Sequence, residues 1–372
     1  MIFDFLVIGG GIAGASAAYE LANDGTVLLL EAESTMGYHA TGRSAALFTR
    51  HYGGPVVRQI NEASARFFET PPAGFCETAL LAPRGCLTVA SPGHEGDLDD
   101  LLAMSQTANA VCRIDPQEAI ERVPFLRPEN VAAAVYEAGV SDIDVATLHL
   151  SFINGAKARG SIIKINQNVI SMSRQTGHWC VTTARESHLA KCVVNAAGAW
   201  ADQIGAMAGA RPIGLVPKRR TAIIINAPLG LDCKAVPAID FAGTDAYIKP
   251  DAGRLMASPG DATPCEAYDA WPDDMDIAVL ADWIERETTL KVAKIEHSWA
   301  GLRSFVADEA PVVGLDPVVA DFFWLAGQGG YGIMMAPILA QLTAELCTAS
   351  QGVLSKTIAP SVGVARLEVE YQ

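Results

Sequence analysis

This sequence lacks long hydrophobic runs, an excess of positive charge and a secretion signal. No apolar run reaches the roughly 20 residues that a helix needs to span a bilayer, so we expect no integral membrane segment. Lys and Arg total 27 against 42 Asp and Glu, and the net charge of −15 argues against nucleic acid as a partner. The N-terminus has no basic stretch before an apolar one, which predicts a cytoplasmic protein and leaves peripheral contact with the inner membrane open.

Paired cysteines are also missing. The eight cysteines are scattered, with no C-x-x-C pair and no histidine at the spacing of a zinc site. They are Cys76, Cys86, Cys112, Cys180, Cys192, Cys233, Cys265 and Cys347. We therefore expect reduced thiols in the core and no metal.

The first thirty residues carry the clearest motif. Residues 3–8 read as a buried strand, 9–14 as a tight turn, 15–23 as a helix and 26–31 as a second strand. Gly9, Gly11 and Gly14 form G-x-G-x-x-G between strand and helix, and Glu31 ends the second strand. In this context the glycines admit a pyrophosphate and the acid accepts from a ribose hydroxyl, so a dinucleotide site is predicted, either flavin or nicotinamide.

Periodicity and turn residues predict further elements along the 372 residues, enough for about two domains. Helices are expected at 55–70, 116–123, 144–159, 277–288 and 333–347. Strands are expected at 161–165, 169–174, 179–183, 191–195, 222–226, 246–249 and 322–326. Nucleotide-domain patterns return twice, so we predict a discontinuous cofactor domain of residues 1–50, 145–210 and 300–372, and a substrate domain of 51–144 and 211–299.

A second G-x-G-x-x-G is formed by Gly327, Gly329 and Gly332. No second strand ending in an acid follows it, which argues against a second dinucleotide site. We expect this strand-to-helix turn to present backbone N–H groups to the ribityl chain and pyrimidine edge of a flavin.

Several segments, in order, resemble the FAD-dependent D-amino-acid oxidase superfamily. They are 9–14 with Glu31, 41–44, 194–200, 301–303, 311–314 and 327–332. Within it, residues 37–39, 43–46, 71–76, 217–220 and 304–308 are similar to bacterial flavin-dependent D-amino-acid dehydrogenases, those acting on D-arginine above all. The resemblance implies an α/β (α+β) two-domain fold: a glutathione-reductase-like Rossmann FAD domain interleaved with an antiparallel-sheet substrate domain that roofs the isoalloxazine.

The resemblance also implies which residues hold FAD. They are Gly9, Gly11, Gly14, Glu31, Thr41, Arg43, Ser44, Val169, Ala197, Gly198, Trp200, Gly327, Gly329, Gly330, Tyr331, Gly332 and Ile333. No cysteine lies between Arg303 and Gly327, where some relatives attach the flavin, so non-covalent FAD is expected.

By the same resemblance, Arg220, Arg303, Tyr52 and Tyr247 would grip the substrate carboxylate, and the Gly330 carbonyl would accept from its amino group. A guanidinium binds a carboxylate through two parallel hydrogen bonds, which suits this role. Arg303 stands in an apolar run, where an arginine must be paired or line a cavity. Arg220 alone reads as part of an exposed basic cluster, and the sequence leaves open whether it or Arg219 faces the site.

Three positions implied for the substrate side chain depart from the arginine-preferring relatives, which carry a histidine, an acid and an amide there. This chain has Leu47, Cys86 and Met334. A guanidinium buried beside them would be unpaired, so we expect neutral or apolar D-amino acids as substrates.

The implied reaction passes a hydride from the substrate Cα to flavin N5, and water then gives a 2-oxo acid and ammonia. Reduced flavin returns its electrons to a quinone, a carrier or oxygen, which the sequence does not decide. One alternative is the same fold acting on a secondary amine of the sarcosine or proline type, or on a 2-hydroxy acid with His39 or His51 as base. Another is a non-catalytic dinucleotide-binding protein.

Overall fold

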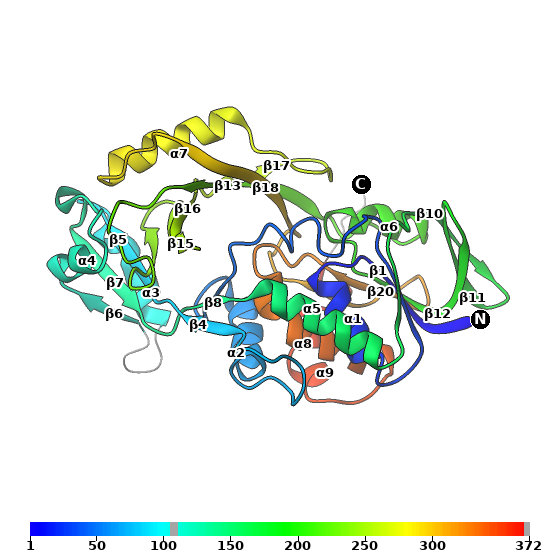
Figure 1. Ribbon diagram of the computed structural model, residues 1–372. Helices are drawn as coiled ribbons and strands as arrows, with labels where there is room; N and C mark the ends of the chain where they lie inside the picture. Colours follow the sequence, from blue (N-terminus) through cyan, green and yellow to red (C-terminus); the bar gives the residue numbers. More distant parts are fainter. Residues whose placement is uncertain (105–110, 368–372) are drawn as a thin grey trace.

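Two large β-sheets, each joined from distant parts of the chain, dominate the computed structural model, which describes residues 1–104 and 111–367 (Figure 1). The first sheet has the order β10 (Val169–Gln175), β11 (His178–Thr183), β12 (Ser187–Asn195), β1 (Ile2–Ile8), β2 (Val27–Leu30) and β9 (Ile162–Lys164). The last part of β12 also pairs with β20 (Phe322–Ala326), which pairs with β19 (Val312–Leu315). Because β1, β2, β9, β12 and β20 run parallel, their carboxyl ends meet at one edge.

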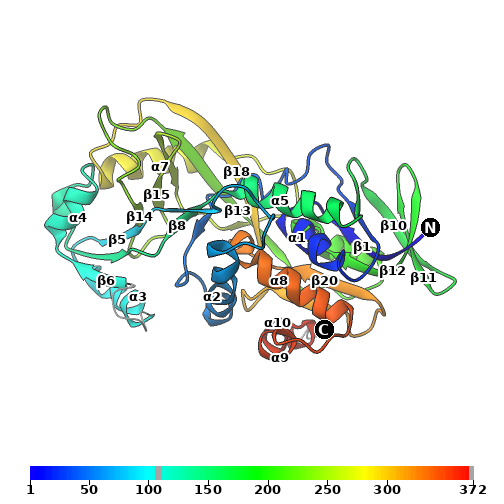
Figure 2. The same cartoon turned by 60° about the horizontal axis from the view of Figure 1, so that its bottom comes forward.

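Helices cover one face of this sheet. They are α1 (Ile12–Leu21), α5 (Val145–Ala158) and α8 (Gly332–Cys347), which lie side by side in Figures 1 and 2. Alternate residues of β1 explain the two faces: Val7 packs toward these helices, while Leu6 and Ile8 join the opposite core. That opposite core is closed by α6 (Ala201–Met207) and the β10–β12 meander. The first sheet therefore confirms the predicted Rossmann-type layer.

The second sheet has the order β17 (Thr263–Pro264), β13 (Val216–Ile225), β16 (Arg254–Ser258), β15 (Tyr247–Asp251), β14 (Ala238–Phe241), β5 (Cys86–Ala90), β7 (Ala133–Glu137) and β6 (Val111–Ile114). The long strand β18 (Ile295–Phe305) also pairs with β13. Its pairs are antiparallel except β5 with β14, which are parallel. The expected antiparallel sheet is thus mixed, because the segment after β5 reaches β14 only through a long connection.

The outer face of the second sheet is covered by α7 (Asp274–Glu287) and α4 (Pro116–Arg122). Leu280 and Ile284 of α7 pack against Ile223, Ile239 and Ile248 of the sheet. Asp115 caps α4, since it accepts a hydrogen bond from the Gln117 N–H, and Pro116 follows it at the first helical position. The inner face of the sheet looks toward the strand ends of the first sheet.

Smaller elements complete the described chain. A three-stranded sheet holds β3 (Leu47–Phe48), β8 (Ser141–Ile143) and β4 (Leu81–Pro83). The remaining helices are α2 (Pro55–Glu69), α3 (Asp99–Met104), α9 (Leu354–Thr357), α10 (Ala359–Val362) and the 3₁₀ turns η1 (Glu95–Leu98), η2 (Pro128–Asn130), η3 (Gly198–Trp200) and η4 (Val364–Arg366). The domain bounds expected from the sequence stay a prediction.

In residues 1–104 and 111–367, no helix has the length and apolar character needed to cross a bilayer. The eight cysteines are all free, but they are not all core residues as expected. Cys86, Cys180 and Cys192 are buried, whereas Cys112 is exposed on β6, where its strand lies at the sheet edge.

Candidate functional site

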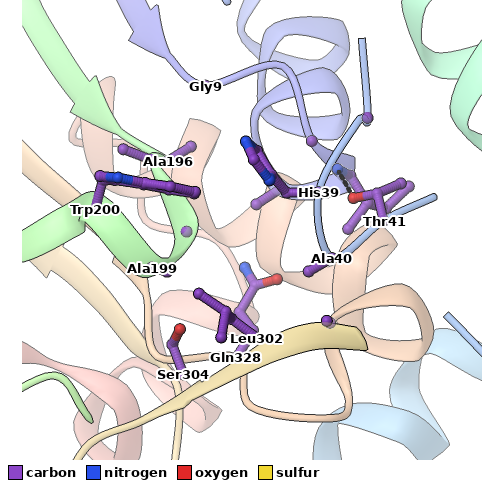
Figure 3. A pocket seen from close by; sticks show the side chains of 18 of the residues that line it. Gly9, His39, Ala40, Thr41, Ala196, Ala199, Trp200, Leu302, Ser304 and Gln328 are labelled. Atoms are coloured by element: carbon purple, nitrogen blue, oxygen red, sulfur yellow. Dashed lines mark hydrogen bonds between the residues drawn. The ribbon is translucent and has the colours of Figure 1, made fainter. Parts of the chain in front are cut away.

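A cavity of about 560 Å³ lies between the two sheets (Figure 3). One wall is made by the carboxyl ends of four parallel strands of the first sheet: Ile8–Gly11, Leu30–Glu31, Ala196–Trp200 and Leu325–Gly330. The other wall comes from β13, β15 and β18, with Leu302 and Ser304 lying across from Gly9 in Figure 3. Ligands of open α/β sheets bind at this edge of the strands.

The first glycine turn allows close backbone approach. Gly9 has φ +108°, and a Cβ there would lie 2.3 Å from the Ala196 carbonyl oxygen. A Cβ on Gly14 would lie 1.9 Å from the Gly9 carbonyl oxygen, so this glycine lets α1 pack on the turn and does not itself line the cavity. Both positions require glycine for the reasons that the motif predicts.

Glu31 is buried at the cavity wall. Its Oε2 accepts from the Gly10 N–H at 2.6 Å, and its Oε1 accepts from the Glu33 N–H at 2.8 Å. The Ile12 N–H donates to Thr41 Oγ1 at 2.9 Å. A carboxylate accepts about four hydrogen bonds, so Glu31 retains acceptor capacity for a ribose hydroxyl.

Two helices begin at the cavity. The N-cap residues, Gly11 of α1 and Tyr331 of α8, provide no side-chain cap. Thr41 accepts from the Ile12 N–H of α1, and the other orphan N–H groups at the two helix starts remain for a ligand. Ile12 and Ile333 line the same cavity. The second glycine motif therefore faces the same space as the first, and the positive ends of two helices favour an anionic or electron-rich ligand there.

Aromatic and charged side chains close the cavity at its flank. His39 and Trp200 lie on facing loops with ring centroids 4.6 Å apart, and His39 Nε2 is 3.0 Å from Glu33 Oε1 (Figure 3). Arg43 lines the cavity, but its guanidinium donates to Asp269 and to the carbonyls of Ala270 and Ala300. Arg43 thus holds the 269–270 segment against the cavity.

The second sheet brings the predicted arginines together. Arg303 lies directly opposite Lys218, and Arg220 opposite Gly301, so both guanidinium groups rise from the same face. The β15–β16 and β13–β16 registers put Tyr247 on that face too. Arg220, Tyr247 and Arg303 all line the cavity.

Arg219 points to the opposite face. Its guanidinium donates to Asp276 of α7 at 2.6 Å, and Arg219 is not among the residues that line the cavity. The alternation of a strand explains this, because neighbouring residues face opposite sides. The sequence left open whether Arg219 or Arg220 faces the site, and it is Arg220 that lines the cavity.

The two guanidinium groups have no carboxylate partner. Within the described ranges neither forms an ion pair, and Arg220 Nε is buried without a hydrogen-bond partner. Burial and the neighbouring Arg303 charge lower the pKa of Arg220. Burial also opposes the Arg303 charge, but Tyr52 and Tyr247 favour it and its pKa is raised. Two adjacent, partly buried cations without an ion-pair partner form a site for an anion.

Tyr52 and Tyr331 border the arginines. Arg303 donates to the Tyr52 hydroxyl, and the Tyr52 ring lies 5.1 Å from that of Tyr331. A Cβ on Gly330 would lie 3.1 Å from the Arg303 guanidinium carbon, so the backbone of Gly330 lies against this group. Burial raises the pKa of Tyr331 to about 12. Tyr52 is exposed and lies outside the cavity lining, as does Tyr331.

The remaining predicted residues fall into two groups. Those lining the cavity are Gly9, Gly11, Glu31, Thr41, Arg43, Ser44, Val169, Ala197, Gly198, Trp200, Gly327, Gly329, Gly330, Gly332 and Ile333. Met334 lies instead in the core beside α1 and α2, and Leu47 packs with Cys86 in a small cluster of the second sheet. None of these three side-chain positions lines the cavity.

Sequence reasoning missed several residues. Gln328 lines the cavity, and its Nε2 is buried without an acceptor. His149 of α5 donates from Nε2 to the Gly10 carbonyl oxygen at 2.9 Å, and burial lowers its pKa. Asp240 of β14 lies beside Cys86. Gln328 stands inside a glycine motif that marks it, but the other two reach the site only through long-range packing that local patterns do not encode.

The cavity fits FAD. Glycine positions without room for a Cβ, two uncapped helix starts and a buried carboxylate suit a dinucleotide, and the unpartnered Gln328 amide suits an acceptor-rich ring. Gly9–Ile12, Glu31, Thr41 and the 327–333 loop would hold it.

Comparison with known proteins agrees with this geometry. A family model described as "FAD dependent oxidoreductase" matches residues 4–346. The mitochondrial dimethylglycine dehydrogenase of Homo sapiens is 26% identical over 89% of this chain and 41% of its own length. The chain thus spans about two fifths of that relative. The glycine oxidase of Geobacillus kaustophilus is 24% identical, covering 92% of each chain.

Solved structures share the fold. L-proline dehydrogenase from P. horikoshii superposes with a TM-score of 0.84 at 24% identity, covering 96% of each chain. Glycine oxidase from Geobacillus kaustophilus gives a TM-score of 0.79 at 22% identity, covering 95% of this chain and 97% of its own. The similarity at this level of identity concerns the two-domain fold.

Proposed function

Because the chain belongs to the family of FAD-dependent oxidoreductases, we propose that it oxidises an amino acid, and specifically a D-amino acid, to a 2-oxo acid and ammonia. The observation that carries this proposal is the pair of guanidinium groups, Arg220 and Arg303, that face the cofactor cavity without a carboxylate partner. An amino-acid carboxylate supplies the missing anion. It would relieve the repulsion between the two cations and restore the pKa of Arg220.

Each residue around the arginines has a proposed part. Arg220 and Arg303 bind the carboxylate, with the Tyr52 and Tyr247 hydroxyls as further donors, and the Gly330 carbonyl accepts from the substrate amine. Together these contacts orient one Cα–H bond. When bound, FAD supplies the acceptor for the hydride that leaves Cα. No side chain has to remove a carbon-bound proton, so positioning is the main contribution of the protein.

The D configuration rests on the resemblance of residues 217–220 and 304–308 to D-amino-acid dehydrogenases. The side-chain preference expected from the sequence rests on Leu47, Cys86 and Met334, of which Met334 lies in the core. It also assumed that no acid lies near Cys86, and Asp240 contradicts that assumption.

A second candidate is oxidation of a secondary amine. Two similar proteins are named for secondary amines, L-proline and iminodiacetate. Two others are named for a tertiary amine, dimethylglycine, and a primary amine, glycine. All four compounds carry a carboxylate that the same pair of arginines would bind. A 2-hydroxy acid would need a base, and His39 and His51 are both engaged with carboxylates, Glu33 and Glu137.

The test is anaerobic mixing of the purified holoenzyme with single substrates while the flavin absorbance is recorded. We expect D-amino acids to bleach the flavin and their L-enantiomers, sarcosine, L-proline and 2-hydroxy acids not to. Bleaching by sarcosine or L-proline alone would select the secondary-amine alternative. Bleaching by no compound would support a non-catalytic protein.

We also propose that FAD is held without a covalent bond, because no cysteine is among the described residues that line the cavity. Acid precipitation of the holoenzyme should leave a yellow supernatant and a colourless pellet. A yellow pellet would contradict this and would direct attention to His39 at the cavity wall.

A further inference from the structure

Asp240 is an acid on the inner face of the second sheet. It lies directly opposite Tyr247 in the β14–β15 pair, and residues opposite each other share a face. The neighbouring Ile239 and Ile248 face the outer core under α7. Asp240 therefore lies on the face that carries Arg220, Tyr247 and Arg303.

The Asp240 side chain is exposed on this face. β14 is an inner strand, paired with β15 and β5, yet Asp240 is exposed, so nothing covers this point of the inner face. Protein surrounds the carboxylate on its other sides. That desolvation, together with Glu137 and Asp245, raises the pKa of Asp240 to about 6.

The surroundings leave Asp240 without a cation. The Cys86 thiol donates to its Oδ2 at 3.4 Å, and among the described residues it forms no ion pair. Its neighbour Glu137 already has partners, because His51 Nδ1 and Thr49 Oγ1 both lie 2.8 Å from Glu137 Oε1. Asp240 is not among the residues that line the cavity, but it lies on the same sheet face as Tyr247, which does. A carboxylate on this face with a perturbed pKa and a free acceptor oxygen is suited to a ligand cation.

We infer that Asp240 recognises the substrate side chain and that this side chain carries a positive charge, as in the basic D-amino acids. The inference rests on the proposed function, since it places the substrate carboxylate on Arg220 and Arg303. Strand spacing of about 4.8 Å puts Asp240 one strand beyond Tyr247 and three strands, roughly 14 Å, from Arg220. The side chain of Arg220 and an extended basic substrate together span that distance. The substrate carboxylate then pairs with Arg220, and the positive charge of the substrate side chain pairs with Asp240.

The arrangement replaces the expectation of an apolar pocket. A neutral side chain would leave the Asp240 carboxylate unpaired when the substrate excludes water, and that loss lowers affinity. A lysine, ornithine or arginine side chain would supply the donor. Cys86 then positions the carboxylate through its thiol and does not itself contact the charge.

The experiment compares matched substrates with the holoenzyme: D-lysine against D-norleucine, and D-arginine against D-citrulline. In each pair the charge differs while the length is similar. We expect kcat/KM to be about ten- to hundredfold higher for the charged member. In Asp240→Asn this ratio should fall close to one, with D-norleucine changed less than about threefold. Asp251→Asn, an exposed acid at the end of β15, is the matched control and should keep the wild-type ratio.

Two outcomes overturn the inference. One is a wild-type enzyme that uses D-norleucine as well as D-lysine, which requires no variant and so does not depend on folding. The other is an Asp240→Asn enzyme with normal flavin content and an unchanged ratio. Flavin reduction by all four compounds at equal rates would contradict the role of Asp240 but not the proposed function. Reduction by none of them would contradict the proposed function as well.

Discussion

At the scale of single residues, binding of the substrate carboxylate depends on Arg303. Replacing it with Met keeps the length of the side chain but removes the donors and the charge. We expect KM for a D-amino acid to rise about 30-fold or more and kcat to fall, because one buried partner of a charge pair is lost. Steady-state kinetics measure both. The neighbouring Arg219→Met is the control, since Arg219 binds Asp276 on the opposite face, and its KM should stay near that of the wild type.

Asp240 gives a pH dependence at the same scale. Its raised pKa of about 6 means that the carboxylate is neutral below that pH and charged above it. Groups that face it are Cys86, Glu137, Tyr247 and Asp245. The D-lysine to D-norleucine ratio of kcat/KM should therefore rise between pH 5 and pH 7, roughly one unit either side of that pKa. A profile of the ratio that is equally steep in Asp240→Asn would assign the titration to another group.

The sequence predicted some of these residues and not others, for a physical reason. Arg303 is marked locally, because an arginine in an apolar run must find a partner or a cavity. The local sequence around Asp240 does not indicate its role, since its neighbours come from β5, β7 and β15, which are far apart in the chain. Arg220 and Arg219 are told apart only by the register with β18.

At the scale of elements, Gly14 decides whether α1 can begin where it does. Ala normally stabilises a helix relative to Gly by about 1 kcal/mol, so the helix itself would gain from Gly14→Ala. We expect the reverse, a lower melting temperature and loss of bound flavin, because the new Cβ meets the Gly9 carbonyl oxygen. Gly139→Ala, where a Cβ meets nothing within 4 Å, is the control and should retain the flavin. Full flavin content in Gly14→Ala would refute the close packing.

Asp4 ties three strands together. It accepts from the Thr26 N–H and hydroxyl of the turn before β2 and pairs with Lys191 of β12 at 2.8 Å. The Lys191 and Thr26 hydrogen bonds lower the pKa of Asp4 to about 2. Because the pKa of Asp4 is lower in the folded chain, its charge stabilises the fold fully above pH 3.8, the ordinary pKa of the group. This stabilisation is lost as the pH falls through the folded pKa of about 2.

We therefore expect Asp4→Asn to reduce the free energy of unfolding by about 1 kcal/mol at pH 7, a value kept small because the site is partly exposed. At pH 2, where the Asp4 carboxyl is about half protonated, the difference should be a small fraction of that at pH 7. Denaturant unfolding at both pH values measures this, with the exposed Asp24→Asn as the control. Equal destabilisation at pH 7 and pH 2 would exclude a charge effect.

Elements with a strong local pattern were predicted well. The strand at 322–326 matches β20, and the helix expected from residue 333 matches α8 within one residue. β18 was not predicted, because its side chains alternate around Gly301 without a continuous apolar face. Its position is set by pairing along the whole of β13, which is a tertiary effect.

At the scale of the whole molecule, the site exists only where the two sheets meet. The first sheet contributes strand ends from residues 8–11, 30–31, 196–200 and 325–330, and the second contributes a face. The glycine motifs predicted the first wall, because strand-to-helix turns have a fixed place at the sheet edge. The second wall follows from strand order, including the parallel β5–β14 pair, which no local pattern indicates.

The most direct measurement is a titration of the oxidised holoenzyme with benzoate, followed by the flavin absorbance spectrum. A carboxylate held by Arg220 and Arg303 beside the cofactor should perturb the spectrum and saturate. Benzamide, which has no charge, should bind far more weakly, and Arg303→Met should weaken benzoate about 30-fold or more. Equal benzoate binding by Arg303→Met and the wild type, or a spectrum that benzoate leaves unchanged, would contradict a carboxylate clamp over the flavin.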